Sequence, residues 1–351
     1  MSGSKRWVNR PEGSNWGDFG EDDQRGRINL LTPEKIKQGI AEVKEGIPFC
    51  LSLPLDYPGG NLLNPRRHPP VIRPTLRNGR PNMNYKLFSD NKDHSDVVSD
   101  DLVVMHLQYS TQWDSLAHVG SMFDANGDGI PEAVYYNGYR AGQDILGPEE
   151  GKDAGVPEPG DQKTTSYATA LGIQNMAESC VQGRGVMIDF HAHFGNKKVV
   201  VDYDILMRVL EQDKVEIEKG DMVGLHTGFA QMLLDMKKKP DLSILDNSCA
   251  ALDGRDAKLL NWITDSGLVV LMADNYAVEA HPAKNHIGCC ATLPLHEHCL
   301  FKNGIHLGEM FYLTPLAQWL RKNGRNRFLL TAPPLRLPGA VGSPSTAVAT
   351  V

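Results

Sequence analysis

Residues 107–118 read Leu-Gln-Tyr-Ser-Thr-Gln-Trp-Asp-Ser-Leu-Ala-His, and they follow a short apolar run that begins at residue 102. If the chain stays extended here, alternate side chains point to one face, so Gln108, Gln112 and Asp114 share a side. A turn after Asp114 could bring His118 back beside them. Two amide oxygens, a carboxylate and an imidazole at close range suit a divalent cation.

The same spacing has a simpler explanation. Polar residues that alternate along a strand commonly form a solvated face, with no ligand bound to it. The spacing alone leaves both interpretations open.

On both sides of this stretch, short apolar runs alternate with amphipathic segments. Turn residues bound each run, which is typical of strands, and Thr-Pro pairs at residues 32–33 and 314–315 are typical helix openings. We expect strands over residues 50–55, 102–111, 185–190, 221–226 and 268–273, and helices from 32, over 202–211, over 253–266 and from 314. The pattern predicts a mixed α/β fold with many short strands and a few amphipathic helices.

No linker-like composition divides the chain clearly. Residues 1–46 are expected to form an N-terminal arm followed by one helix, and residues 47–351 to form a single catalytic domain. Within that domain, residues 57–100 are rich in Pro, Gly, Asn and Arg, so they predict a loop-rich insertion. Segments of this kind often cover a substrate site.

The composition excludes several classes of partner. The chain has 351 residues, 41% hydrophobic and 23% charged, which is typical of a packed globular enzyme. Its formal net charge of −7 argues against nucleic acid or an anionic membrane as a partner. Six cysteines without a CxxC pair and the lack of an apolar leader or span lead us to expect a cytoplasmic protein with reduced thiols.

The segment at 107–118 resembles the signature His-x-Gly-Thr-His-x-Asp-x-Pro-x-His of the cyclase family, which includes kynurenine formamidases, isatin hydrolases and trans-dienelactone hydrolases. It is more similar to a longer branch of that family, with Gln-x-x-Thr-Gln-Trp-Asp-x-Leu-x-His. Further similar segments occur along nearly the whole chain: Asn15–Gly17, Asn29–Glu34, Gly220–Gly228, Ala273–Glu279, Pro294–His296, Leu307–Phe311 and Ala332–Leu335. The resemblance implies the family fold, a swivelling β/β/α-like mixed sheet with flanking helices.

The resemblance also implies a metal site. It nominates Gln112, Asp114, His118, His296 and Glu309 as the residues around the ion, with His118 as general base and Glu309 as the second catalytic group. His298 and His306 compete with His296, which is preferred on the family spacing. Because glutamine replaces two histidines of the signature, we expect weaker binding and a shift from Zn²⁺ toward Mn²⁺, with either ion possible.

A small-molecule substrate is the expected partner. Around it we place Gln108 and Trp113 from the signature segment, together with Trp16, Phe123 and His193, since ligand pockets combine apolar walls with a few polar anchors. The resemblance further implies a homodimer or a larger homo-oligomer.

The resulting functional hypothesis is a metal-dependent hydrolase of a small cyclic or aryl amide or lactone. One alternative is a ring-forming or dehydrating tailoring enzyme of secondary metabolism that uses the same groups. A second alternative is a metal-free binding protein, in which the two glutamines mark a lost catalytic site.

Overall fold

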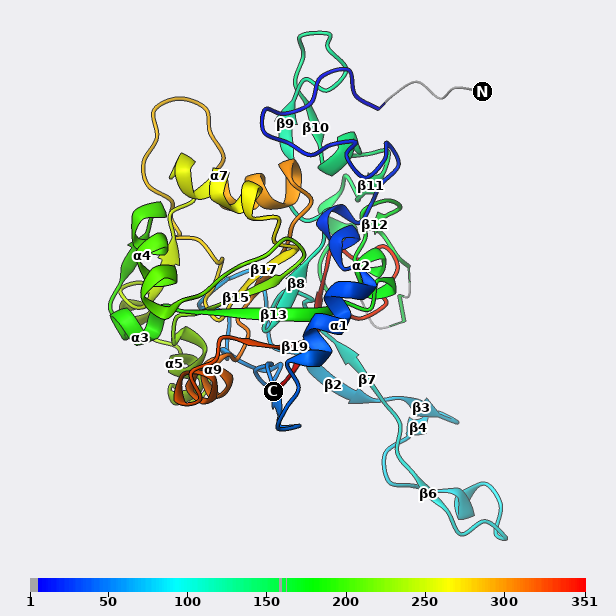
Figure 1. Ribbon diagram of the computed structural model, residues 1–351. Coiled ribbons are helices and arrows are strands. Elements are labelled where there is room, and N and C mark those ends of the chain that lie inside the picture. Colours follow the sequence, from blue (N-terminus) through cyan, green and yellow to red (C-terminus); the bar gives the residue numbers. More distant parts are fainter. Residues whose placement is uncertain (1–5, 158–159, 162) are drawn as a thin grey trace.

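The centre of the molecule is a nine-stranded sheet, shown in Figure 1 in a computed structural model that describes residues 6–157, 160–161 and 163–351. In spatial order its strands are β1 (Pro48–Cys50), β21 (Val348–Thr350), β19 (Arg327–Thr331), β13 (Gln182–Asp189), β15 (Met222–His226), β17 (Val270–Ala273), β18 (His306–Glu309), β8 (Gln112–Asp114) and β20 (Gly342–Pro344). The four strands from β13 to β18 are parallel to one another, and the remaining pairings are antiparallel. The expected mixed sheet is therefore confirmed.

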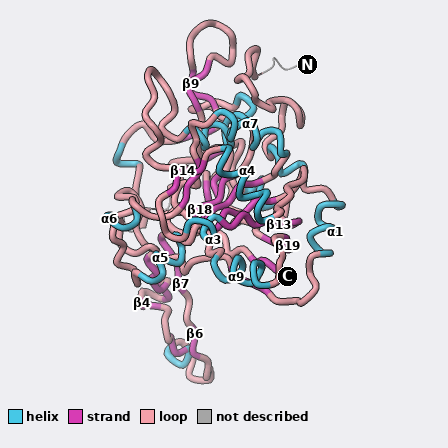
Figure 2. Tube along the Cα trace, turned by 60° about the vertical axis from the view of Figure 1, so that its left-hand side comes forward, coloured by secondary structure: helices cyan, strands magenta, loops and turns pink. Residues whose placement is uncertain are grey.

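Helices flank this sheet, and long loops surround it (Figure 2). The α-helices are α1 (Pro33–Ala41), α2 (Gln174–Glu178), α3 (Phe190–Phe194), α4 (Tyr203–Asp213), α5 (Phe229–Asp235), α6 (Leu242–Leu245), α7 (Ala257–Ser266), α8 (Pro294–His296) and α9 (Thr314–Lys322). Four short 3₁₀ turns, η1 (Gly26–Leu30), η2 (Leu87–Ser89), η3 (Tyr136–Gly138) and η4 (Gly151–Asp153), and the π-helical η5 (Glu297–Lys302) complete the helical elements of the described chain.

Capping residues set where the expected helices begin, and α7 starts at Ala257, four residues later than expected. The Thr32 hydroxyl accepts a hydrogen bond from Lys35 N at the start of α1, and Asp202 and Asp256 cap α4 and α7 in the same way. Gly267 ends α7 at φ 68°, a left-handed conformation that glycine adopts without strain. These local signals could be recognised without tertiary information.

The segment before α1 is docked onto the body of the protein. Trp16 is 1% exposed, and its indole N–H donates to Phe301 O at 2.7 Å. The buried Arg27 guanidinium donates to Ile263 O and Thr264 O at 3.0 and 2.7 Å, in the last turn of α7. Hydrogen bonds to carbonyl groups in the last turn of α7 help to fix this polar segment on the body of the protein.

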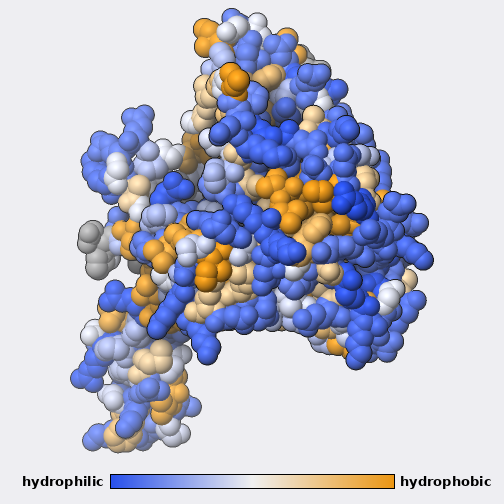
Figure 3. Space-filling view, turned by 90° about the vertical axis from the view of Figure 1, so that its left-hand side faces the viewer, coloured by the Kyte–Doolittle hydropathy of each residue, from blue (hydrophilic) through white to orange (hydrophobic). Residues whose placement is uncertain are grey.

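A narrow arm projects from the body (Figure 1) within and just beyond the expected insertion. It contains three two-stranded ladders: β2 (Val71–Pro74) with β7 (Asp101–Val104), β3 (Leu76–Arg77) with β4 (Arg80–Pro81), and β5 (Tyr85–Lys86) with β6 (Val97–Val98). Hydrophilic and hydrophobic residues are interspersed on its surface (Figure 3). Its exposed apolar side chains are Val71, Ile72, Leu76, Met83, Phe88, Val97, Leu102 and Val103.

The prediction of one continuous strand over residues 102–111 is wrong. The chain leaves the arm at Val104, passes through a turn over residues 107–110, and becomes extended again in β8. The first half pairs with β2 in the arm, whereas β8 pairs with β18 and β20 in the main sheet. Two strands in different sheets therefore replace one continuous strand.

Three further two-stranded ladders lie outside the main sheet: β9 (Ser121–Phe123) with β10 (Glu132–Val134), β11 (Ile145–Leu146) with β12 (Tyr167–Ala168), and β14 (Val199–Val201) with β16 (Ala250–Leu252). Within the described residues, no helix has both the length and the apolar character needed to cross a membrane.

Candidate metal centre

Strand β8 lies in the main sheet between β18 and β20. In this register Gln112 is opposite Glu309, and Asp114 is opposite Gly342. Side chains that alternate along a strand place Gln112 and Asp114 on one face and Trp113 on the other. The Gln112 Nε2 group donates to Glu309 Oε2 at 3.3 Å, so the two facing side chains meet directly.

The opposite face of β8 belongs to the hydrophobic core. Trp113 is completely buried, its ring centroid lies 4.9 Å from that of Phe311, and its N–H donates to Ala332 O at 2.8 Å. A Cβ on Gly308 would come within 2.7 Å of the Trp113 ring, so only glycine fits opposite this tryptophan. This packing holds β8 and β18 at a fixed spacing behind the polar face.

Three charged side chains converge on the polar face. Asp114, His296 and Glu309 each present a ligand atom, and these atoms all lie within 4.8 Å of one another. His296 Nε2 is 3.3 Å from Glu309 Oε1 and 3.8 Å from Asp114 Oδ2. All three residues are buried. Two carboxylates this close repel each other unless positive charge lies between them.

Several buried oxygen atoms of this group have no hydrogen-bond partner. Both carboxylate oxygens of Asp114 and the Oε1 atom of Gln112 are enclosed and unpaired. Buried polar atoms are normally satisfied, and an unpaired buried carboxylate is costly. Unpaired oxygens beside an imidazole and a second carboxylate fit the donor set of a divalent cation.

Glu279 fixes the orientation of the His296 ring. Its Oε1 atom lies 2.8 Å from His296 Nδ1 and accepts a hydrogen bond from the His296 backbone N–H, while its Oε2 atom accepts one from the Leu295 N–H. An imidazole that donates Nδ1–H to a carboxylate presents Nε2 to the ligand on its other side. Metal-binding histidines in proteins commonly have this arrangement.

The protonation of the group reflects its burial and its charges. Burial raises the pKa of Asp114, and the neighbouring Glu309 charge raises it further. Burial would also raise the pKa of Glu309, but hydrogen bonding and positive charge from His296 outweigh it and lower that pKa. Despite its own burial, His296 has a pKa raised to about 10 by Glu279 and Glu309. A proton and a metal ion compete for the same ring nitrogen.

His118 is brought back to Asp114 by a tight turn, as expected. His118 N donates to Ser115 O at 3.0 Å, and His118 Nε2 lies 3.8 Å from Asp114 Oδ1. Its side chain is 22% exposed, whereas Asp114 is fully enclosed. His118 is therefore the member of this cluster that combines contact with the buried acid and access to solvent.

Gln108 is not in register with Gln112 and Asp114, because it lies in the turn that precedes β8. Its side chain instead packs against Gly342, the residue opposite Asp114, and its carbonyl accepts a hydrogen bond from Arg67 Nη1 at 2.6 Å. Gln108 and Arg67 line a small cavity with Tyr276 and Met310. Gln108 therefore does not share the polar face of β8 with Gln112 and Asp114.

The other expected substrate-contacting residues are not brought to this group. Trp113 and Trp16 are core side chains. Phe123 packs edge to face against Trp16, with ring centroids 6.0 Å apart. His193, on α3, has its Nε2 atom 2.9 Å from Asp213 Oδ2 at the end of α4. Both tryptophans were expected to line the substrate site because they are aromatic. In the structure their rings pack in the hydrophobic core instead.

The competing histidines are also placed elsewhere. His298 Nε2 is 2.9 Å from the Thr264 hydroxyl, and burial lowers the pKa of His298 to about 4. His306 is on β18, and burial lowers its pKa to about 3. Neither is in the three-residue group, so the structure places His296 there.

Two residues near the centre had not been assigned a role in it. Glu279 belongs to a segment that resembles the family, but only the fold shows that its carboxylate contacts His296. Arg67 lies at the base of the arm. Burial raises the pKa of Asp114 and bonding to His296 lowers the pKa of Glu309, and the positive charge of Arg67 is a smaller influence that favours the ionised form of both. No local pattern around Arg67 distinguishes it from the other arginines of a loop-rich segment.

The fold and this geometry can now be compared with known proteins. A family model described as "Putative cyclase" matches residues 50–280, so the chain belongs to the cyclase family. A crystal structure of a novel cyclase is 28% identical, with a TM-score of 0.70 over 96% of this chain and 97% of that chain. Among curated proteins, none matches the sequence.

Two isatin hydrolases share the fold at lower identity. Isatin hydrolase A from Ralstonia solanacearum is 14% identical, with a TM-score of 0.55 over 91% of this chain and 97% of that chain. Isatin hydrolase A from Labrenzia aggregata, bound to benzyl benzoate, is 12% identical, with a TM-score of 0.54 over 90% and 97%. These likenesses concern the fold alone.

Proposed function

We propose that this protein is a metal-dependent hydrolase that opens a small cyclic or aryl amide or lactone. The observation that carries the proposal is the set of unpaired, buried oxygens on Gln112 and Asp114 facing His296 and Glu309. Membership of the cyclase family and the fold shared with isatin hydrolases support the choice of reaction.

Asp114, His296 and Glu309 would hold the ion, with Gln112 Oε1 as a neutral fourth donor. When bound, a divalent ion polarises a substrate carbonyl and lowers the pKa of a coordinated water. The donor set has more oxygen than nitrogen, which favours Mn²⁺, and Zn²⁺ is the other candidate.

The protein's own residues would supply the proton transfer. His118, exposed on one side and next to Asp114 on the other, accepts a proton from the attacking water. It then returns that proton to the nitrogen or oxygen that leaves the carbonyl carbon. The product gains one water across the broken bond: the hydroxyl on carbon and the hydrogen on the leaving atom.

Metal analysis tests the first half of this proposal. Protein purified without a chelator should contain about one Mn²⁺ or Zn²⁺ per chain by mass spectrometry, and Asp114→Ala should lose it. Asp124→Ala is the matched control, because Asp124 binds the backbone of an Asn- and Gly-rich turn resembling a calcium loop. Wild-type protein without a bound ion would favour the metal-free binding protein, and an equal amount of metal in Asp114→Ala would place the ion outside this group.

The reaction itself is tested with labelled water. Candidate cyclic amides and lactones are incubated with the metal-loaded enzyme in H₂¹⁸O, and products are analysed by mass. Hydrolysis requires uptake of one ¹⁸O atom, whereas ring formation or dehydration requires none. His118→Ala should keep its metal but lose roughly 10²- to 10⁴-fold in rate.

A further inference from the structure

Arg67 is a half-buried arginine that has no ion-pair partner. Its Nη1 group donates to Gln108 O at 2.6 Å, and this is its only side-chain hydrogen bond within the part of the chain that the structure describes. A guanidinium has five N–H donors, so most of them are unused. Because a charge withdrawn from water is costly without a partner, an anion from outside the chain would be bound here with a gain in free energy.

The unused donors of Arg67 can be reached by a ligand. Its Nε and Nη2 atoms have no acceptor among the described residues, and neither atom is enclosed. In this respect they differ from the carboxylate oxygens of Asp114, which are enclosed as well as unpaired. One whole edge of the guanidinium is therefore both free and accessible.

Two other arginines of this chain bind carboxylates with that same edge. The Nε and Nη2 atoms of Arg184 donate to the two oxygens of Asp221, both at 2.9 Å. The same two atoms of Arg140 donate to the two oxygens of Glu132, both at 2.8 Å. Two parallel hydrogen bonds of this kind match the geometry of a carboxylate and are stronger than bonds between neutral groups. At Arg67 the corresponding carboxylate is missing.

The contacts of Arg67 place it close to the metal centre. Gln108, whose carbonyl it binds, packs its side chain against Gly342, the residue opposite Asp114 in the sheet. Arg67 also lines a small cavity with Met310, the residue that follows the glutamate of the metal centre. An anion bound to Arg67 would therefore lie near the candidate ion site.

The charge of Arg67 acts on the metal centre without being paired by it. Burial has the largest influence on the pKa of Asp114 and of Glu309, and the positive charge of Arg67 acts on both in the opposite sense, toward the ionised form. Within the described residues neither carboxylate forms an ion pair with the guanidinium. Its hydrogen-bonding edge thus stays available.

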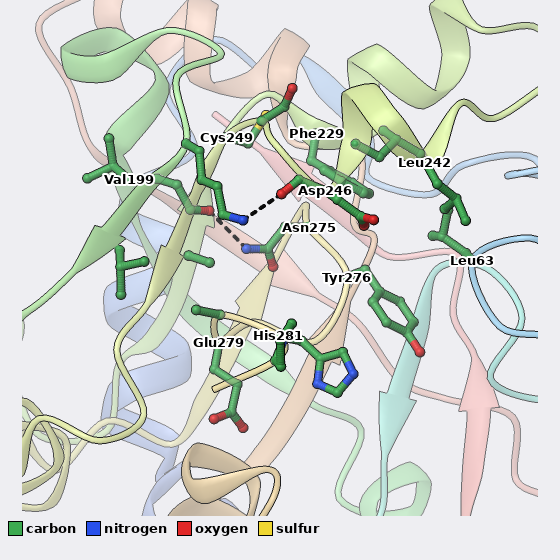
Figure 4. Close-up of a pocket in the computed structure, with 18 of the residues that line it drawn as sticks. Leu63, Val199, Phe229, Leu242, Asp246, Cys249, Asn275, Tyr276, Glu279 and His281 are labelled. Carbon is green, nitrogen blue, oxygen red and sulfur yellow. Dashed lines mark hydrogen bonds between the residues drawn. The ribbon is translucent and has the colours of Figure 1, made fainter. Parts of the chain in front are cut away.

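The cavity beside Arg67 limits the size of the group that can bind there. Its volume is about 10 Å³, which is room for one small polar group. Leu63 and Tyr276 form part of its wall, and both also line a neighbouring apolar cavity of about 360 Å³, where they are labelled in Figure 4. The small cavity excludes a ring and admits only a compact group, such as a carboxylate oxygen.

We propose that Arg67 binds a carboxylate of the substrate through Nε and Nη2, so that the preferred substrates are small amides or lactones that carry a negative charge. The identity of the substrate rests on the proposed hydrolysis, whereas the binding of the anion does not. Arg67 is then a specificity-determining residue and takes no part in proton transfer.

The test compares two probes of the same shape that differ in charge. Benzoate carries a carboxylate at neutral pH, and benzamide replaces it with a neutral amide. Isothermal titration of the full-length protein should show benzoate binding about tenfold more tightly than benzamide, because its bonds to the guanidinium are charge-assisted. Equal affinities, or no binding of benzoate, would overturn the proposal without any variant being needed.

Three variants locate the bound benzoate. Arg67→Gln should bind both probes equally, and Arg67→Lys, which keeps the charge and a donor for Gln108 O but loses the two-pronged edge, should keep a preference of roughly threefold. Arg66→Gln is the matched control, because Arg66 is the exposed neighbour of Arg67 and should keep the full preference. A tenfold preference that persists in Arg67→Gln would place the anion elsewhere.

Chelation separates this inference from the proposed hydrolysis, since benzoate could also bind a metal ion directly. Protein treated with EDTA should still prefer benzoate, and loss of the preference on chelation would contradict a role for Arg67. A preference that depends on Arg67 in a protein without metal would support the anion site and count against hydrolysis. A metal-loaded hydrolase without such a preference would overturn this inference alone.

Discussion

At the scale of single residues, the amide of Gln112 is the most informative side chain of the candidate metal centre. Its nitrogen bonds to Glu309, and this interaction leaves its oxygen unpaired beside Asp114. An imidazole at this position would offer a stronger nitrogen donor. We therefore expect Gln112 to influence which ion the site prefers, whereas Asp114, His296 and Glu309 come together without it.

Replacing this amide tests that interpretation. Gln112→His should raise the affinity for Zn²⁺ relative to Mn²⁺ by roughly tenfold, because imidazole suits zinc better than an amide oxygen does. Competition titrations with both ions measure the ratio, and Gln108→His, in the preceding turn, is the comparison variant. An unchanged Zn²⁺ to Mn²⁺ ratio in Gln112→His would show that Gln112 is not a ligand.

Glu279 allows a second residue-scale prediction. Glu279→Gln keeps the size of the side chain but removes the charge that orients His296. Metal affinity should fall by roughly 10- to 100-fold, as is typical when the partner of a ligating histidine is changed. Isothermal titration with Mn²⁺ checks this, with Glu297→Gln as the control, because the Glu297 carboxylate accepts a hydrogen bond from the Ser121 hydroxyl and is not in the metal group. Equal Mn²⁺ affinity in wild type and Glu279→Gln would exclude this role.

At the scale of secondary-structure elements, the projecting arm has little packing of its own to stabilise it. Isolated two-stranded ladders are marginally stable in water, and this arm exposes Ile72, Leu76 and Phe88 by 68%, 77% and 57%. Residues 71–104 contain five Lys and Arg against five Asp, so the arm is neutral although the whole chain has a net charge of −7. We expect the exposed apolar side chains of this neutral arm to be covered by a second copy.

The expected homo-oligomer can be tested through this arm. Wild-type protein should have the mass of a dimer or larger assembly by light scattering, and the double variant Ile72→Asp, Leu76→Asp should be a monomer. Ile130→Asp is the control, because Ile130 is 69% exposed but lies outside the arm. A monomeric wild type, or an arm variant with unchanged mass, would exclude an arm-mediated assembly.

At the scale of the whole molecule, a charged network ties the parallel strands to α9. Asp189, at the end of β13, lies 2.7 Å from His226 Nδ1 and accepts a hydrogen bond from Arg321 Nε at 2.9 Å. Asp274 also faces His226, and Asp213 faces Arg321. Burial of Asp189 opposes ionisation, but bonding to His226 and Arg321 prevails and lowers the pKa of Asp189 to about 2.

This shift predicts how stability changes with pH. A carboxyl whose pKa falls from 3.8 to about 2 on folding contributes roughly 2 kcal/mol above its unfolded pKa, and this is lost as pH falls toward 2. The pKa of His226 is raised, so its charged form stabilises the fold below about pH 6.5 and the contribution fades at higher pH. The pair should therefore stabilise most between about pH 4 and 6.5.

Urea unfolding across this pH range provides the measurement. The stability difference between wild type and Asp189→Asn should be largest near pH 5 and should shrink toward pH 2 and above neutrality. Asp101→Asn, at an exposed position in the arm, should follow the wild type throughout. A constant difference between wild type and Asp189→Asn from pH 3 to pH 8 would contradict the linkage.

Local sequence signals were sufficient for the fold class, the capped helices, the central strands and the alternation that sets Gln112 and Asp114 against Trp113. Each of these depends on neighbours within a few positions, through capping, period-two alternation or a tight turn. Resemblance along the chain nominated His296 and Glu309, nearly two hundred residues away. Why those two lie beside Asp114 was not visible in any local pattern.

Tertiary structure alone decided the remainder. Pairing of β8 with β18 sets Glu309 against Gln112, and the 107–110 turn takes Gln108 out of register. Trp113 and Trp16 are buried in the core, although their aromatic side chains would suit the wall of a substrate site equally well. Long-range partners such as Glu279 and Arg67 emerge only when distant segments meet, because contacts between them depend on strand register and burial rather than on sequence spacing.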